Sequence, residues 1–183
     1  MRAFFRTFRR DERAIAATEF ALLLPTIIGL MVGTFEVARA VSAKSKVSQM
    51  TGAIGDLISQ KNSVTSSNLN DLINGTSNIL QPLPTTGATV DVQSIVYDTS
   101  TKKYYVDWTL HKVGSGSAQT NGANSDYQGA DPPGAATIKV TVTYDFEPTF
   151  SKIYKDINPS SGGKITLSET FFSARSGAAV PLE

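Results

Sequence analysis

The segment AIAATEFALLLPTIIGLMVGTF, from Ala14 to Phe35, decides how the rest of the chain can fold. It is an apolar run of 22 residues, interrupted by one charged residue, Glu19, and one proline, Pro25. A helix of this length, rising about 1.5 Å per residue, covers roughly 33 Å and can cross the ~30 Å hydrocarbon core of a bilayer. The segment therefore predicts a transmembrane helix over residues 14–35. Because an acid inside a membrane usually has a functional role, Glu19 is the first candidate site residue.

Residues 1–13 are basic and predict a short cytoplasmic leader. They hold five arginines against Asp11 and Glu12, whereas the whole chain has a formal net charge of only +1. A basic flank beside an apolar run follows the positive-inside rule, which places the N-terminus in the cytoplasm and residues 36–183 outside the inner membrane. The alternative is a secretory signal peptide cleaved after Ala40 or Ala43. The apolar core of such a signal peptide would be longer than usual and would contain a glutamate. We therefore favour a transmembrane anchor that is not removed by signal peptidase.

The helical pattern continues beyond the membrane segment. Apolar residues recur every three or four positions over residues 36–60, which predicts an amphipathic helix and, with residues 14–35, one helix running to Gln60. The predicted apolar face includes Val37, Val41, Val47, Met50, Ile54, Leu57 and Ile58. A second, shorter helix is expected over residues 66–80, before Pro82 and Pro84.

The pattern then changes to alternation with a period of two, which predicts strands. The four expected strands cover residues 88–97, 102–113, 136–146 and 164–174. Residues 114–134 are rich in Gly, Ser, Asn and Pro and are expected to form a long loop. A long helix packed on a small antiparallel sheet of about four strands is an α+β domain.

The sequence contains few of the residues and motifs that are typical of enzyme active sites. It contains no cysteine and one histidine, His111, which cannot make a convincing zinc site and which we interpret as a sheet residue. No nucleophile elbow, P-loop or dinucleotide-binding motif occurs. We therefore expect no enzymatic activity, no cofactor, no metal, no small-molecule substrate and no nucleic-acid partner. Trp108 and the tyrosine-rich hairpin around it are expected to be core, with a sugar- or surface-binding patch as the alternative.

The predicted transmembrane segment gives a stronger indication of function than the rest of the chain. Small residues repeat every fourth position around Pro25, at Ala17, Ala21, Gly29 and Gly33, and the last two form a G-x-x-x-G. Such a row lets another helix approach closely, so that van der Waals packing drives association in lipid. We expect these four residues to form a helix-packing face. Pro25 removes the hydrogen bond to the carbonyl of Ala21 and is expected to kink the helix.

The sequence of this N-terminus resembles that of a known family. The run from Arg13 to Pro25, with its A-x-x-E-F-A-L-x-x-P pattern, is similar to the TadE/TadG-like proteins of tight-adherence (Flp, type IVc) pili, as are Glu36 and Arg39 after the apolar stretch. The late segments VTVTY and ITLS also look like that family. The short length favours the TadE type, because the longer TadG type carries a large additional domain.

The resemblance implies a minor pilin or pseudopilin that supports pilus assembly and surface adhesion. It implies a membrane location, other pilins and the assembly platform as partners, and a prepilin peptidase that cuts so that a glutamate becomes residue five. In this chain that cut falls between Ala14 and Ile15, and Glu19 would set the register between neighbouring helices. The alternative is a single-pass anchor that displays a binding or scaffold domain and never enters a pilus.

Overall fold

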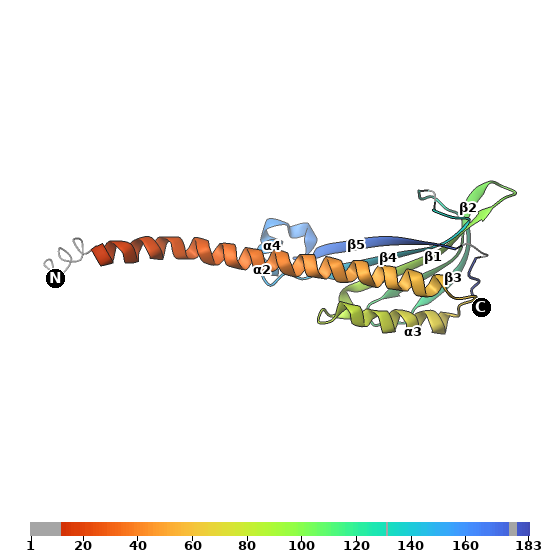
Figure 1. The fold of residues 1–183 in the computed structure, drawn as a ribbon, viewed down its shortest axis with the longest axis horizontal. Helices are drawn as coiled ribbons and strands as arrows, with labels where there is room; N and C mark the ends of the chain where they lie inside the picture. Colours follow the sequence, from red (N-terminus) through yellow and green to blue (C-terminus); the bar gives the residue numbers. More distant parts are fainter. Residues whose placement is uncertain (1–11, 131, 176–178) are drawn as a thin grey trace. The chain divides into compact units, whose positions relative to one another are not determined.

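The computed structural model describes residues 12–130, 132–175 and 179–183, and it divides into two compact units. The first unit ends at Ala40 and the second runs from Val41 to Glu183. One helix, α2 (Glu12–Ser59), is continuous through both and through Pro25, as the chain-coloured ribbon shows (Figure 1). The expected basic leader lies outside the described residues except for its last two positions, and the side chain of Ala14 is not described. Each unit is described separately below.

The second unit is built on one antiparallel sheet of five strands in the order β3-β2-β1-β4-β5. The strands are β1 (Ala88–Asp98), β2 (Lys103–Val113), β3 (Gln119–Asp126), β4 (Ala136–Phe146) and β5 (Ile165–Arg175). The predicted α+β architecture, a long helix packed on a small antiparallel sheet, is confirmed. The sheet has one strand more than expected, because β3 lies within residues 114–134, where a loop was predicted; that prediction was wrong.

The other elements are short. They comprise the helices α3 (Ser66–Ser77) and α4 (Ser151–Ile157) and the 3-10 turns Asn78–Leu80, Thr85–Gly87 and Pro159–Ser161. The helix expected over residues 66–80 thus ends its regular α-helical part at Ser77. Its N-terminus is capped by Thr65, whose side chain accepts a hydrogen bond from the Asn68 amide at 3.1 Å.

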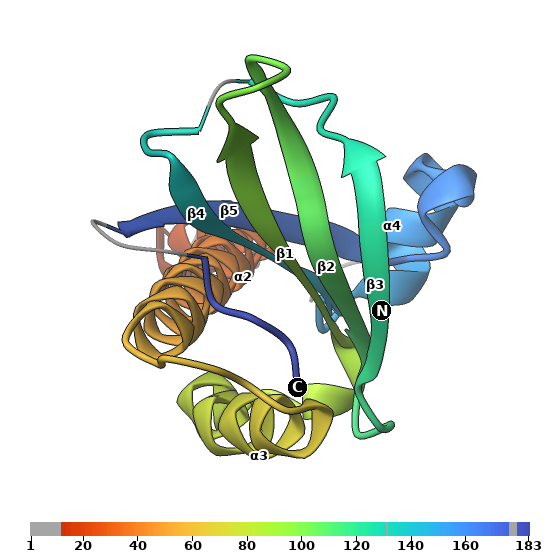
Figure 2. The same cartoon turned by 90° about the vertical axis from the view of Figure 1, so that its right-hand side faces the viewer.

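Helices α2 and α3 cover one face of the sheet, and the core lies between these helices and the sheet (Figure 2). Strand β4 shows the alternation most clearly, since Ile138, Val140 and Val142 are buried while the residues between them are half-buried. In β1 the alternation shifts at a register irregularity between Ser94 and Ile95. Both of those residues are therefore buried, and Val96, two residues after Ser94, is only half-buried.

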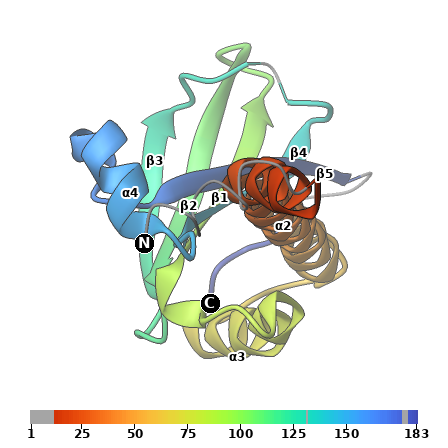
Figure 3. The ribbon, with the colours of Figure 1, turned by 90° about the vertical axis from the view of Figure 1, so that its left-hand side faces the viewer.

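The part of α2 within the second unit lies against β4 and β5 (Figure 3). Its buried face is made of Ala43, Val47, Met50, Ile54 and Ile58. Val37, Val41 and Leu57, which the periodicity assigned to the same face, are exposed. The Lys44 ammonium lies 2.7 Å from the Glu169 carboxylate and also donates to the carbonyl of Ser168, which fixes the start of this segment beside the first half of β5.

One buried cation ties α3 to the sheet. The Lys112 side chain points into the unit and donates to Asn70 Oδ1 at 2.7 Å and to the carbonyl of Gly116. Burial lowers the pKa of Lys112, because desolvation disfavours its charged form. The Asn70 oxygen also accepts the Ala118 amide, so this contact also fixes the start of β3.

Helix α2 packs tightly against the sheet at Gly55. A Cβ added there would lie 2.7 Å from Cδ1 of Phe171, whereas at Gly52, one turn earlier, it would meet nothing within 4 Å. We expect Gly55→Ala to destabilise the second unit by about 1–3 kcal/mol, because the Phe171 ring must move. Gly52→Ala is the matched control and is expected to stabilise by roughly 0.5–1 kcal/mol through helix propensity. Chemical denaturation of the full chain in detergent micelles measures both, and equal effects would contradict this assignment.

Candidate assembly surface on the N-terminal helix

The first unit leaves its apolar side chains uncovered. In the part of α2 that the structure describes, every side chain from Ile15 to Met31 is exposed. The large apolar ones are Ile15, Phe20, Leu22, Leu23, Leu24, Ile27, Ile28, Leu30 and Met31. Monomeric soluble proteins rarely expose so large an apolar surface, which makes this surface a candidate for contact with lipid or with other helices.

The same helix is the one that is long and apolar enough to cross a membrane among the described residues. It lies near the N-terminus, and none of its apolar window is buried within the protein. Length and composition thus make it a candidate membrane anchor. The two hydroxyl groups of Thr18 and Thr34 are already satisfied, since they donate to the carbonyls of Ile15 at 2.7 Å and Leu30 at 2.8 Å. Neither hydroxyl needs a partner from another chain.

The row of small residues is open along its described length. Ala17, Ala21, Pro25, Gly29 and Gly33 are all exposed, and a Cβ at Gly29 or Gly33 would meet nothing within 4 Å. Nothing in this chain therefore requires glycine at those two positions. Glycine costs about 0.5–1 kcal/mol relative to alanine inside a helix, so these two positions are candidates for close approach of another chain.

Glu19 is exposed on this apolar helix, one turn after Ile15. Of the side chains that the structure describes, none forms an ion pair with Glu19. An ionised carboxylate placed in lipid costs several kcal/mol, about 2.5–3.5 kcal/mol at the centre of a membrane helix. Such a carboxylate is stabilised when a cation from a neighbouring chain reaches it.

The apolar stretch ends at a local ion pair. The Arg39 guanidinium lies 3.4 Å from the Glu36 carboxylate and 6.0 Å from the centre of the Phe35 ring. Both charged side chains are half-buried. A cation that contacts an aromatic face and a carboxylate at once suits the boundary between an apolar and a polar environment. These residues therefore mark the end of the candidate membrane segment.

His111, which the sequence predicted to be a sheet residue, lies beside an aspartate on the sheet. His111 Nδ1 lies 2.6 Å from Asp91 Oδ1 on neighbouring strands, and both side chains are exposed. Among the described residues, no group of three or more His, Cys, Asp or Glu side chains lies close enough to hold a metal ion. The pair is consistent with the sheet role expected of His111.

Trp108 is core, as expected, whereas the tyrosines near it are not. Trp108 is buried, and its Nε1–H donates to the carbonyl of Val180 at 2.7 Å. Tyr97, Tyr104 and Tyr105 are half-buried at the end of the same hairpin. If these aromatic residues form a binding patch, the alternative considered above, the patch contains the tyrosines but not the buried Trp108. Sequence reasoning missed the residues that complete their surroundings, because residues 126–129 were assigned to a loop.

Comparison with known proteins agrees with the resemblance of the N-terminus. A family model described as TadE-like protein matches residues 14–53, which covers the candidate membrane segment and the first turns of α2 on the sheet. No curated protein and no solved structure matches the chain. The likeness to TadE-like proteins is therefore a finding about this segment of the chain.

Proposed function

We propose that this protein, whose residues 14–53 match the TadE-like family, is a minor pilin or pseudopilin of a tight-adherence pilus. The observation that carries the proposal is the uncovered apolar surface of the first unit, with a row of small residues and one acid on it. A plain anchor requires apolar length only. A helix that assembles with other helices also needs small residues for close approach and polar groups that fix the register.

In this proposal the N-terminus is cytoplasmic and the second unit lies outside the inner membrane, on its periplasmic side or on the pilus. The five arginines of residues 1–13 support that orientation through the positive-inside rule. The partners are other pilins of the same system and the assembly platform, reached through the membrane segment. Ala17, Ala21, Gly29 and Gly33 form the packing face, and Pro25 loosens the helix between them.

Maturation by a prepilin peptidase is part of the proposal. A cut between Ala14 and Ile15 would leave an α-amine on Ile15 and make Glu19 the fifth residue. The carboxylate of Glu19 could then pair with the α-amine of a neighbouring subunit. The pairing offsets the cost of placing both charges in lipid, and it also sets the axial position of one helix against the next.

The packing face is tested by a double substitution, Gly29→Leu with Gly33→Leu, in the cells that make the protein. Bulky side chains hold the helices apart, and a packing loss of about 1.4 kcal/mol lowers association about tenfold. We expect a comparable loss of pili by electron microscopy, with an unchanged amount of the protein in the membrane fraction.

The matched control is Ile27→Leu with Met31→Leu, which changes two exposed apolar residues outside the row and is expected to leave piliation intact. If the glycine variant is also fully piliated, the anchored binding or scaffold domain becomes the better description of this protein.

A further inference from the structure

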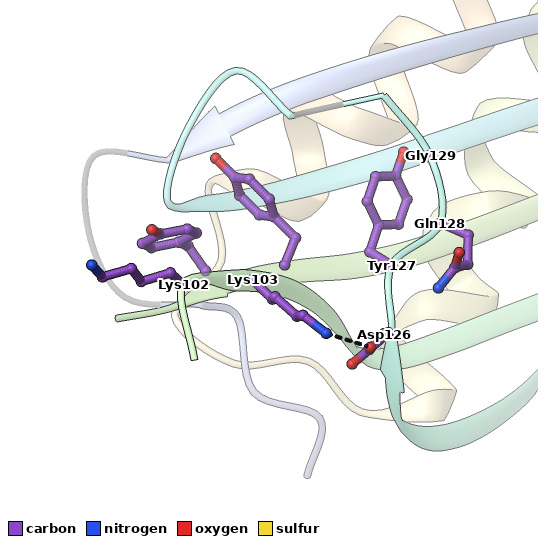
Figure 4. A pocket seen from close by; sticks show the side chains of 8 residues that line it. Lys102, Lys103, Asp126, Tyr127, Gln128 and Gly129 are labelled. Atoms are coloured by element: carbon purple, nitrogen blue, oxygen red, sulfur yellow. Dashed lines mark hydrogen bonds and ion pairs between the residues drawn. The ribbon is translucent and has the colours of Figure 1, made fainter. Parts of the chain in front are cut away.

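A pocket at one end of the second unit brings together residues that the assembly role does not use. It is a cavity of about 640 Å³ between the β1–β2 turn and the segment after β3 (Figure 4). We call it the tip pocket and define it by Tyr97, Tyr104, Tyr127, Lys103, Asp126 and Gln128. Its volume is within the range of about 300–1,000 Å³ that small-molecule sites occupy.

The strand register places the tip pocket far from where α2 enters this unit. Val96 pairs with Ala136, and Ala136 pairs with Arg175, so the pocket lies at the same end of the sheet as the last residue of β5. Lys44, near the start of α2 in this unit, contacts Ser168 and Glu169 in the first half of β5. The pocket is therefore at the opposite end of the second unit and is open to an external ligand.

The walls of the pocket are aromatic and held in place. The Tyr97 and Tyr104 rings lie 5.0 Å apart at an angle of 59°, which forms a corner of two ring faces. The third ring, Tyr127, has the Lys139 ammonium 5.5 Å from its centre, and its backbone amide donates to the carbonyl of Tyr104 at 2.9 Å. Burial raises the pKa of Tyr127, so its hydroxyl remains a hydrogen-bond donor at neutral pH.

Polar groups of both signs lie around these rings. The Lys103 ammonium is 3.4 Å from the Asp126 carboxylate, and Gln128 contributes an amide beside them (Figure 4). Ammonium, carboxylate, amide and phenol groups together can donate to and accept from hydroxyl groups. An aromatic face, with its negative quadrupole, attracts the weakly positive C–H face of a sugar ring.

The charges around the pocket do not favour a polyanion. An adjoining hollow is lined by Asp98, Asp107 and Asp126 with Lys103. The Ser100 amide and the Thr101 hydroxyl donate to Asp98 and lower its pKa, so this carboxylate stays ionised. These three carboxylates are balanced by the three cations Lys102, Lys103 and Lys139, so the site has no net positive charge to attract phosphate or uronate chains, and a neutral sugar fits both the rings and the charges.

We infer that the tip pocket is a binding site for a neutral oligosaccharide. The tyrosine rings stack on sugar faces, and Lys103, Asp126 and Gln128 hold the hydroxyl groups. The site differs from the helix surface proposed above in location and chemistry, and it departs from the sequence-based expectation that the protein binds no small molecule.

The test uses the full chain in detergent micelles, titrated with cellotetraose, maltotetraose and chitotetraose by calorimetry and saturation-transfer NMR. We expect at least one of the three to bind, with Tyr104→Ala weakening binding about tenfold through loss of stacking. Tyr104→Phe keeps the ring and is expected to bind within about threefold of the unchanged protein.

A second variant tests the pocket without removing a ring. A Cβ at Gly129 would overlap the hydroxyl of Tyr127, so Gly129→Ala displaces that ring and is also expected to weaken binding. Tyr154→Ala, on α4 outside the pocket, is the matched control and should bind normally. The inference is overturned if none of the three sugars binds at millimolar concentration, or if Tyr104→Ala and Gly129→Ala both bind unchanged. Binding of a single-stranded oligonucleotide at these residues in place of sugar would overturn it as well.

Discussion

Replacing Glu19 with alanine is expected to abolish piliation while the protein remains in the membrane at its normal level. The carboxylate is exposed on an apolar helix and lies one turn after the proposed new N-terminus at Ile15. Removing a charge from a membrane helix makes insertion easier, by up to about 2.5–3.5 kcal/mol at the centre of the bilayer, so loss of the protein is not expected. What is lost is the group that attracts the α-amine of a neighbour.

Two further variants separate charge from size. Glu19→Gln keeps the length and the hydrogen-bonding capacity of the side chain but removes the charge, so it is expected to behave like alanine. Glu19→Asp keeps the charge on a shorter side chain and is expected to restore part of the piliation. Electron microscopy counts the pili, and immunoblots of membrane fractions report the protein level.

Intact-mass measurement of the membrane-purified, unsubstituted protein completes this experiment. Loss of residues 1–14 is expected, because the pairing requires an α-amine on Ile15. If those residues are retained, the cleavage step and the pairing with an α-amine are both wrong. Normal piliation in the alanine and glutamine variants would instead favour the anchored scaffold domain.

Strong local periodicity is what made most of the fold predictable. The spacing of three and four residues along α2 and the alternation along β4 report which side of an element is apolar, and both elements bury such a side. Strand β3 has no such signal: its sequence QTNGANSD is polar and contains a glycine. It pairs with β2 alone, at the edge of the sheet, so backbone hydrogen bonds form it without an apolar face.

Contacts between distant parts of the chain account for the features that sequence reasoning missed. Gly55 allows contact with Phe171, which follows it by more than a hundred residues. The tip pocket depends in the same way on Tyr127 and Gln128, which meet the β1–β2 turn only after β3 has paired. The candidate residues of the membrane segment, by contrast, are local in sequence, because one helix presents them all.

The second large effect is expected at Trp108, the one tryptophan of the chain, whose replacement should strongly destabilise the second unit. Its indole is buried in the core and donates to the carbonyl of Val180, a residue that is itself fully buried. The following residues pair with the α2–α3 connection, through Val64 N to Pro181 O at 3.1 Å and Glu183 N to Val64 O at 2.9 Å. Trp108 therefore joins the sheet, the end of the chain and the helical layer.

Trp108→Ala is expected to cost about 3–5 kcal/mol, a large part of the 5–15 kcal/mol that stabilises a typical domain. In Trp108→Phe the phenyl ring fills most of the volume of the indole, but the Val180 carbonyl loses its hydrogen-bond donor. This loss is expected to lower the free energy of unfolding by about 1–3 kcal/mol. Tyr105→Ala, a half-buried aromatic on the same strand, is the control and is expected to cost less than either.

Because these substitutions remove the only tryptophan, unfolding should be followed by pulse proteolysis in urea rather than by fluorescence. The full chain is kept in detergent micelles, so that the first unit stays helical and cleavage reports the second unit. If Trp108→Phe were as stable as the unchanged protein, the hydrogen bond to Val180 would not hold the end of the chain. Stability would then depend on the volume of the indole, because a core packed at crystal-like density loses contacts when a cavity replaces a ring.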